Sequence, residues 1–257
     1  MELFRLFLTS LCFLLCEGAR MRIINGREAA PHSRPYMALI NLERHDNEII
    51  CGGSLIRPRW VLTAAHCDKF GWTKKIILGA HSRERKPSEQ WWQEFRVEKS
   101  IKHPHFNKTN LSGDLRLMKL NRRAKLTKGV QLLKLPTTFE DPGEDSTCET
   151  AGWGQTKNAD AADNLMEVNV TVLERDKCAK HWSKHSANIT ENVICTIVGP
   201  GGKDTCGGDS GGPLICNGEF TGMTSFGEGV CGKLKDASVF TRLTEEYIRW
   251  ITETITD

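Results

Sequence analysis

Residues Gly207 to Pro213 read GGDSGGP: a serine with glycines on both sides, an acid directly before it and a strand pattern directly after it. Glycine adopts backbone conformations that are closed to other residues, so the chain can bend sharply here and expose the Ser210 hydroxyl. The same bend can aim neighbouring N–H groups at one point, where they would stabilise an oxyanion. The segment therefore predicts a nucleophilic serine, with a glycine-rich turn and an idle serine as the alternative.

Two earlier segments hold candidate partners for this serine. Thr63 to Cys67 reads TAAHC, in which small residues crowd one side of His66 and the following cysteine can anchor it. Gly113 to Leu117 reads GDLRL, in which Asp114 leads into an alternating apolar strand and is placed for burial against a partner. Taken alone, each pattern has a structural alternative, because a lone histidine is usually structural and an acid before a strand is usually a turn residue.

Apolar and polar residues alternate along several short segments, which is the pattern of half-buried β-strands. Met166, Val168, Val170 and Val172 face one way, while Glu167, Asn169 and Thr171 face the other. Further short strands are expected at residues 60–63, 75–78, 95–97, 115–118, 213–216, 221–224 and 239–241. Many short strands between Gly, Pro and Asn turns predict an all-β barrel or sandwich. At the C-terminus, helical spacing of Leu243, Tyr247, Ile248, Ile251 and Ile255 predicts a helix docked on the barrel.

The composition is that of an ordinary globular protein. The chain has 257 residues, 39% of them hydrophobic, and 35 Lys and Arg against 32 Asp and Glu, which leaves a net charge of +3. The apolar content and low net charge exclude a mostly disordered chain, and 23 Gly and 9 Pro without a three-residue period exclude collagen. So small a charge excess, spread along the chain, argues against a dedicated nucleic-acid binder, which needs clustered cations.

Residues 1–18 have the features of a secretory signal peptide. Arg5 precedes an apolar run from Leu6 to Leu15, and the pattern ends at Gly18. The run is too short to span a bilayer, which takes roughly 20 residues, and no later segment comes closer, so no membrane span is expected. We therefore expect a secreted protein, with storage in cytoplasmic secretory granules as one variant of that route.

The cysteines and sequons fit the secretory route. Of ten cysteines, eight remain after removal of Cys12 and Cys16 with the signal peptide. An even number in a secreted chain predicts four disulfides, with a pairing that spacing alone leaves open. Buried free thiols or zinc ligands are the alternative, although no cysteine pair has zinc spacing. Sequons stand at Asn107, Asn110, Asn169 and Asn188, and we expect two or three to be glycosylated.

The order His66, Asp114, Ser210, within TAAHC, GDL and GDSGGP, resembles the chymotrypsin-type serine peptidases, and the resemblance runs from Ile23 to the C-terminal helix. It implies an all-β fold, a chymotrypsin-like double six-stranded β-barrel with a C-terminal α-helix. Residues 23–257 would form one peptidase domain of two barrel halves. Segments such as ILGAHS at 77–82 and EVNVT at 167–171 resemble in particular the tryptic granzymes of killer lymphocytes, of the granzyme A and K type.

The resemblance assigns roles to the three residues. Ser210 would attack the scissile carbonyl, His66 would take and return its proton, and Asp114 would orient and stabilise the imidazole. The N–H groups of Gly208 and Ser210 would receive the oxyanion. No metal or organic cofactor enters this scheme, and the substrates would be proteins and peptides.

Activation is also implied by the resemblance. Residues 19–22 would form an activation propeptide, and cleavage after Arg22 would free an α-amine at Ile23. That amine would turn inward and pair with Asp209. Because an unpaired buried charge is strongly unfavourable, the oxyanion loop should stay unformed before cleavage, so the chain as written would be an inactive precursor.

Specificity would come from Asp204, which matches the floor of the trypsin primary pocket and would select Arg or Lys. A solvated loop acid is the alternative for this residue. Ser225 and Gly227 should offer backbone that extends the substrate as an added strand. Ser238 stands where the trypsin-like wall usually has glycine and should narrow the pocket, and Thr205 adds a methyl group. We therefore expect Arg to be preferred over Lys.

The resemblance further selects the disulfides Cys51–Cys67, Cys148–Cys216, Cys178–Cys195 and Cys206–Cys231. No spare cysteine remains to join two subunits, so a monomer is expected. Serpin-type inhibitors are expected partners of such a peptidase. Basic groups at 83–86, 122–125 and Lys177, Lys180 and Lys184 could bind glycosaminoglycan, although a merely solvated face is the more ordinary interpretation.

Two other functions stay open from sequence. A family relative without catalysis could bind glycosaminoglycan or microbial surfaces, although such proteins usually lose the histidine or the serine. A digestive-type trypsin would share the same chemistry, and its site of expression rather than its sequence would distinguish it.

Overall fold

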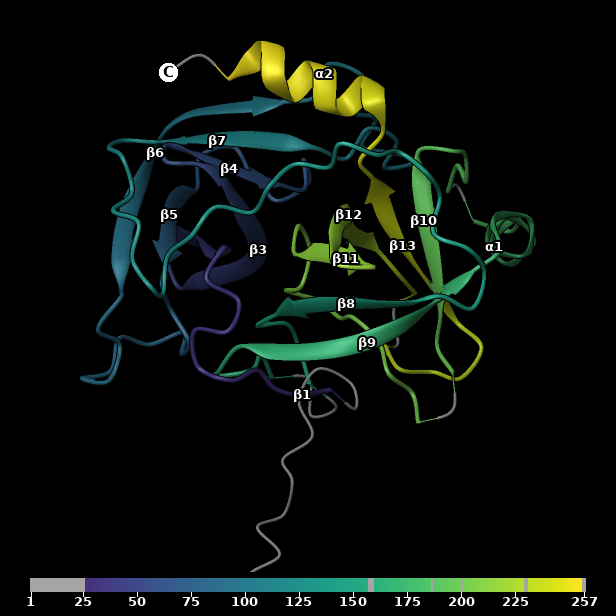
Figure 1. Cartoon of the computed structure of the whole chain (residues 1–257), viewed down its shortest axis with the longest axis horizontal. Helices are drawn as coiled ribbons and strands as arrows, with labels where there is room; N and C mark the ends of the chain where they lie inside the picture. The colour runs from purple at the N-terminus through teal and green to yellow at the C-terminus, as the bar shows by residue number, and fades with distance from the viewer. Residues whose placement is uncertain (1–25, 157–159, 186, 200, 229–230, 256–257) are drawn as a thin grey trace, which may run out of the picture.

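The computed structural model describes residues 26–156, 160–185, 187–199, 201–228 and 231–255. Two antiparallel β-barrels lie side by side, with the earlier part of the chain in one and the later part in the other (Figure 1). A C-terminal helix lies across the top of this view. The predicted double barrel with a C-terminal helix is therefore confirmed.

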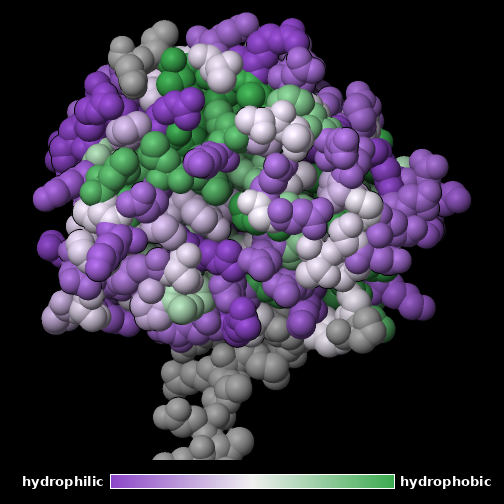
Figure 2. All heavy atoms as spheres, in the orientation of Figure 1, coloured by the Kyte–Doolittle hydropathy of each residue, from purple (hydrophilic) through white to green (hydrophobic). Residues whose placement is uncertain are grey.

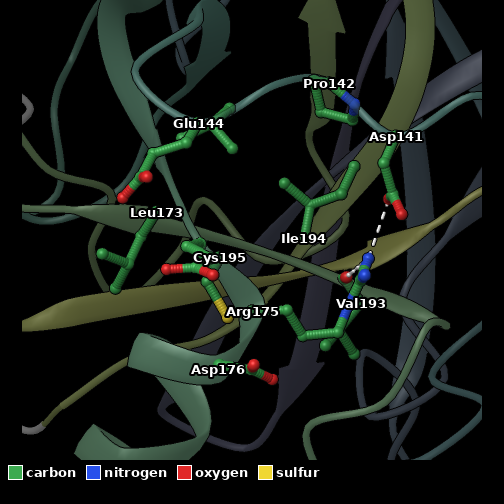
Figure 3. A pocket seen from close by; sticks show the side chains of 11 residues that line it. Asp141, Pro142, Glu144, Leu173, Arg175, Asp176, Val193, Ile194 and Cys195 are labelled. Carbon is green, nitrogen blue, oxygen red and sulfur yellow. Dashed lines mark hydrogen bonds and ion pairs between the residues drawn. The ribbon is translucent and has the colours of Figure 1, made fainter.

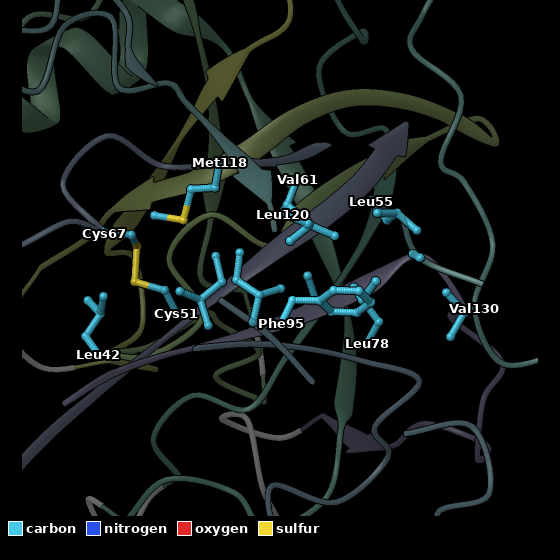
Figure 4. Close-up of a cluster of buried hydrophobic side chains, with 14 of the residues drawn as sticks. Leu42, Cys51, Leu55, Val61, Cys67, Leu78, Phe95, Met118, Leu120 and Val130 are labelled. Atoms are coloured by element: carbon cyan, nitrogen blue, oxygen red, sulfur yellow. A yellow bond between two sulfur atoms is a disulfide. The ribbon is translucent and has the colours of Figure 1, made fainter. Parts of the chain in front are cut away.

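The first barrel closes through six strands in the order β2-β3-β4-β7-β6-β5. Their bounds are β2 (Met37–Arg44), β3 (Asn47–Arg57), β4 (Trp60–Thr63), β5 (Thr73–Leu78), β6 (Gln93–Lys102) and β7 (Arg116–Leu120). Its interior is a cluster of buried aliphatic side chains around Phe95, which is 1% exposed, together with the disulfide Cys51–Cys67 (Figure 4). The predicted strands at 60–63, 75–78 and 95–97 lie within this barrel, while that at 115–118 begins one residue later than expected.

The second barrel closes through β8, β9, β10, β13, β12 and β11, because β9 pairs with both β8 and β10. Their bounds are β8 (Thr147–Gly152), β9 (Met166–Leu173), β10 (Val193–Ile197), β11 (Pro213–Cys216), β12 (Glu219–Phe226) and β13 (Ala237–Arg242). The short β1 (Arg27–Glu28) adds to the free side of β9. The predicted alternation in β9 is confirmed, since its four apolar side chains are buried and Asn169 is exposed.

Two helices flank the barrels. The helix α1 (Arg175–Trp182) follows β9 and is joined to β10 by Cys178–Cys195. The helix α2 (Glu245–Thr254) begins at Thr244, whose hydroxyl accepts a hydrogen bond from the N–H of Tyr247. Tyr247 and Ile251 of α2 are buried in one cluster with side chains of β4 and β7 from the first barrel and of β12 from the second. The predicted terminal helix thus packs on both barrels.

Hydrophilic residues dominate the face seen in Figure 2, and the apolar residues on it gather mainly in the upper half, on the side of α2. Within the described residues, no helix is long and apolar enough to cross a membrane. Large apolar side chains are rarely exposed in this part of the chain, and Phe70, at the tip of the loop between β4 and β5, is fully exposed.

Candidate active site

The carboxylate of Asp114 anchors the histidine. Asp114 is fully buried just before β7, and its Oδ2 lies 2.8 Å from Nδ1 of His66. The backbone N–H of His66 donates to Oδ1 at 3.0 Å, so the same carboxylate fixes both the ring and the turn that carries it. The disulfide Cys51–Cys67 ties the next residue to β3. The imidazole is thus held through Nδ1, while Nε2 lies 3.9 Å from Sγ of Cys67.

The serine loop packs directly against the histidine turn. The backbone N–H of Gly52 in β3 donates to the carbonyl of Ser210 at 2.8 Å, and that carbonyl lies 3.6 Å from Sγ of Cys67. Gly211 has a φ of +80°, and a Cβ there would meet Thr63 Oγ1 at 2.2 Å. Only glycine can occupy such a position without strain. Gly211, directly after Ser210, therefore lets the two barrels approach closely enough to bring the serine loop beside His66.

The Ser210 hydroxyl makes no hydrogen bond of its own among the described residues. Catalytic hydrogen bonds are often long or absent before substrate binds. The structure thus brings the serine loop and the histidine turn together across the barrel interface, without a hydrogen bond on the Ser210 hydroxyl in the described part of the chain.

Asp209 is buried behind the serine loop with 1% of its surface exposed. Its carboxylate accepts hydrogen bonds from the N–H groups of Gly154 and Cys206, at 2.8 and 2.9 Å. Burial raises the pKa of Asp209 to about 7, against the effect of these two donors. Gly208, beside it, has a φ of +100°, the left-handed conformation that glycine allows. The expected partner, Ile23, and the cleavage site at Arg22 lie outside the described residues.

A pocket of about 300 Å³ opens beside Ser210. Its lining includes Thr205, Ser225 and Gly227 from the predicted substrate-binding set. Asp204 lies behind it, 5% exposed, and accepts hydrogen bonds from the N–H groups of Thr205 and Gly232 and from the Ser238 hydroxyl, the last at 2.6 Å. The predicted pocket residues therefore lie together, next to the nucleophile.

No cation pairs with Asp204 within the described residues. Burial raises the pKa of this carboxyl, and the three donors and the charge of Asp236 act on it less strongly. A buried carboxylate with hydrogen-bond donors but no cation is an arrangement that a bound guanidinium or ammonium would complete. A Cβ on Gly227 would lie 3.2 Å from the Ser238 hydroxyl, so Ser238 lies directly beside a residue that lines the pocket.

Two features of the site were not predicted. The Ser225 hydroxyl donates to Asp114 Oδ2 at 2.5 Å, so this residue contributes its side chain as well as its backbone. The β12–β13 register shifts between Thr224 and Phe226, which re-aims the side chain that lies between them. A serine in a strand gives no sequence signal of such a contact.

Arg116 is the second unexpected feature. Although it begins β7, it is 8% exposed and pairs with Asp68 at 2.7 Å. Its Nε donates to the carbonyl of Ala65, directly before His66, and Ser100 accepts a further bond. The available signal was a charged residue at an alternating position of an apolar strand, two residues after Asp114.

The structure contains four disulfides, Cys51–Cys67, Cys148–Cys216, Cys178–Cys195 and Cys206–Cys231, which are the pairs that the resemblance implies. Cys206–Cys231 joins two segments that line the pocket. The sequon residues Asn107, Asn169 and Asn188 are exposed and Asn110 is half-buried.

Another cavity, of about 320 Å³, lies where α1 meets β9 and β10, away from the predicted residues (Figure 3). Arg175 bridges it, donating to Asp141 at 2.8 Å and to the carbonyl of Val193. Arg175 therefore already has its partners in this cavity. Among the described residues, the group that could hold a metal ion is His181, Glu228 and Asp236, of which Glu228 also lines the pocket beside Ser210.

The expected basic groups are partly neutralised. Lys177 lies 2.5 Å from Glu144 and 3.5 Å from Glu174. Arg83 lies 3.9 Å from both Glu48 and Asp163. These pairs offset the charge of Arg83 and Lys177, and glycosaminoglycan binding by the basic groups stays a prediction.

The chain matches known proteins over nearly all of its length. The family model described as Trypsin matches residues 23–251. Granzyme A of Bos taurus is 41% identical over 261 residues, covering 97% of this chain and 95% of that protein. Glandular kallikrein of Sus scrofa is 39% identical, covering 92% of this chain and 97% of that protein. The solved structure of neuropsin, a serine protease expressed in the limbic system of mouse brain, is 36% identical with a TM-score of 0.77, covering 90% of this chain and 99% of its own. A match of this extent makes the chain a member of the trypsin family of chymotrypsin-type serine peptidases, and thus a serine endopeptidase.

Proposed function

We propose that this peptidase cleaves peptide bonds after Arg, and less readily after Lys, once cleavage after Arg22 has freed Ile23. The observation that carries the proposal is Asp204, a buried carboxylate without a cation partner in the described part of the chain, behind a pocket that opens beside Ser210. A buried anion of this kind is relieved by a cationic substrate side chain. The Ser238 hydroxyl, which donates to Asp204, would narrow the pocket and favour the planar, forked guanidinium over an ammonium.

In this mechanism Ser210 attacks the carbonyl of the bound peptide, and Nε2 of His66 takes the hydroxyl proton and then delivers it to the leaving amine. Asp114 keeps Nδ1 protonated and stabilises the imidazolium, assisted by the Ser225 hydroxyl on the same oxygen. The N–H groups of Gly208 and Ser210 receive the oxyanion, each worth about 3–4 kcal/mol of barrier. The products are an acyl-enzyme on Ser210 and then a free carboxylate after water attacks.

The precursor would be made with residues 1–18 as a signal peptide and 19–22 as a propeptide, leaving 23–257 as the peptidase domain. Pairing of the Ile23 amine with Asp209 would order the oxyanion loop. The likeness to granzyme A supports a granzyme-like role in lymphocytes, with secretion or granule storage. A monomer fits the four disulfides, which use all eight cysteines outside the signal peptide. Glycans would be carried on the exposed sequons, and serpin-type inhibitors would bind the active site.

Asp204→Ser tests the proposal. We expect turnover of Arg peptides by the cleaved enzyme to collapse, while Ser210 stays reactive to small acylating reagents. Asp163→Asn, an exposed acid with a side chain 67% accessible, is the matched control and should leave turnover unchanged. Persistent Arg turnover in Asp204→Ser would refute the pocket assignment, and failure of a serine-directed inhibitor to label the cleaved enzyme would favour a non-catalytic binding protein.

Arg22→Gln tests activation separately. The chain should be secreted and folded but inert. Full activity without a new terminus at Ile23, read by N-terminal sequencing, would refute the activation step.

A further inference from the structure

Three potential metal ligands converge beside the pocket from separate parts of the second barrel. His181 lies in the last turn of α1, Glu228 follows β12, and Asp236 precedes β13. One ligand atom from each lies within 4.8 Å of the others, and Nε2 of His181 is 2.7 Å from Oε1 of Glu228. The convergence depends on the fold, because His181 stands 47 positions before Glu228 in the sequence.

The buried member of this group has an unused oxygen. Asp236 is 6% exposed, and its Oδ2 is fully buried with no hydrogen-bond partner among the described residues. A buried carboxylate oxygen without a partner is costly, and native structures usually satisfy such an atom with a donor, a water or an ion. The nearest cation, Lys233, lies 3.6 Å from the other oxygen, Oδ1, and 4.0 Å from Glu228. Its side chain is 63% exposed, so it can move aside at little cost.

We propose that His181, Glu228 and Asp236 form a binding site for a zinc ion. One imidazole nitrogen and two carboxylate oxygens are a ligand set that Zn²⁺ accepts, with water in the fourth position of its tetrahedron. Calcium and magnesium prefer oxygen ligands alone, so the histidine selects against them. The two carboxylates balance the double charge of the ion, and the charge of Lys233 competes with it for the same two carboxylates.

Two contacts couple the site to the pocket. Glu228 lines the pocket directly, and Gly232, between the two acidic ligands, donates its N–H to Asp204 at 2.9 Å. A zinc ion at Asp236 and Glu228 would add positive charge beside Asp204, where the negative charge of Asp236 now acts. Zinc should therefore weaken binding of cationic substrate side chains and raise KM for Arg peptides. This effect of zinc on KM rests on the proposed function, whereas zinc binding itself does not.

Calorimetric titration of the Arg22-cleaved enzyme with zinc chloride tests the site. We expect one equivalent to bind, calcium and magnesium chloride to give no binding at the same concentrations, and His181→Ala and Asp236→Asn each to weaken zinc by at least about tenfold. Lys233→Ala should tighten it several-fold. His185→Ala, which removes a neighbouring exposed histidine outside the group, is the matched control and should bind as the parent does.

Several outcomes would overturn the site: no zinc binding, equal binding in His181→Ala, or an equal loss in His185→Ala. Because Asp236→Asn could disturb folding, its Tm without zinc is measured, and His181→Ala, on a half-exposed residue, carries the test if that Tm falls. Inhibition is read separately as KM for Arg peptides with and without zinc. Zinc binding without a change in KM would refute the coupling, while failure of the proposed function is read from Asp204→Ser without zinc.

Discussion

The buried carboxylate of Asp209 should make the uncleaved protein lose stability as pH rises, and Asp209→Asn in the Arg22→Gln background isolates the effect. Asp209 is 1% exposed, and burial raises its pKa to about 7, compared with about 3.9 in an unfolded chain. In the uncleaved chain no amine exists at Ile23 to pair with it. The folded state therefore holds the proton more tightly than the unfolded state does.

The sign and size of the pH effect on stability follow from the thermodynamic linkage between proton binding and folding. Because the folded-state pKa lies above the unfolded one, the stability contributed by protonated Asp209 is fully present below about pH 4 and is lost as pH rises through about 7. The folded and unfolded pKa values differ by about 3. Because a difference of one pKa unit is worth ~1.4 kcal/mol, this corresponds to about 4 kcal/mol of folding free energy. Asparagine stays neutral, so the variant avoids this loss. Its amide also opposes one backbone donor, at a cost of about 1–3 kcal/mol that does not depend on pH.

Urea unfolding followed by tryptophan fluorescence, between pH 4 and 8, measures the effect. The free energy of unfolding of Asp209→Asn, relative to its parent, should rise by about 4 kcal/mol across this range. Other carboxylates titrate alike in both proteins and cancel in the difference. In the Arg22-cleaved enzyme the Ile23 amine should pair with Asp209 and abolish this rise. Parallel curves for the uncleaved pair would refute the reasoning.

Three further substitutions test the pocket wall, the serine loop and the C-terminal helix. Ser238→Gly removes the hydroxyl donor to Asp204, so the preference for Arg over Lys, measured as a ratio of kcat/KM on matched fluorogenic peptides, should fall several-fold; an unchanged ratio contradicts this. Gly211→Ala places a Cβ 2.2 Å from Thr63 Oγ1 at a φ of +80°, so calorimetry should show a Tm several degrees lower and activity should largely disappear. Ile251→Ala empties a fully buried position in α2 and should lower the free energy of urea unfolding by about 2–5 kcal/mol, with a value under 1 counting against tight docking of the helix.

The alternation of apolar and polar residues predicted those strands that have one face buried in the core and the other exposed to solvent. In β9 the alternation survives because Asn169 reaches solvent between buried valines. In β2 it does not, since Met37 to Ile40 are all buried where barrel and neighbouring structure cover both faces. The short α1 was missed as well, because its eight residues bury few side chains and a disulfide from Cys178 helps to hold it. The local pattern of apolar residues therefore fails to predict an element where tertiary contacts stabilise that element.

The residues of the candidate site likewise include some that a local motif predicts and one that no local motif predicts. Local motifs mark Ser210, His66 and Asp114, because the backbone around them requires small neighbouring residues. Gly211, which packs against the histidine turn, is one such neighbour. The Ser225 hydroxyl on Asp114 depends on a strand irregularity and on a contact 111 residues distant in the chain, which no short pattern encodes.

In the proposed mechanism, catalysis and specificity depend on different parts of this architecture. His66 and Asp114 belong to the first barrel and Ser210 to the second, so their alignment depends on contacts between barrels, such as the 2.8 Å hydrogen bond from Gly52 to the Ser210 carbonyl. Asp204, with Ser238 and the other donors to it, lies wholly in the second barrel. Loosening the interface should therefore lower kcat for every substrate and leave the Arg-to-Lys ratio intact, because the pocket moves as one piece with its own barrel. Changes within the pocket should alter that ratio while a small acylating reagent, which needs no pocket, still reacts with the serine.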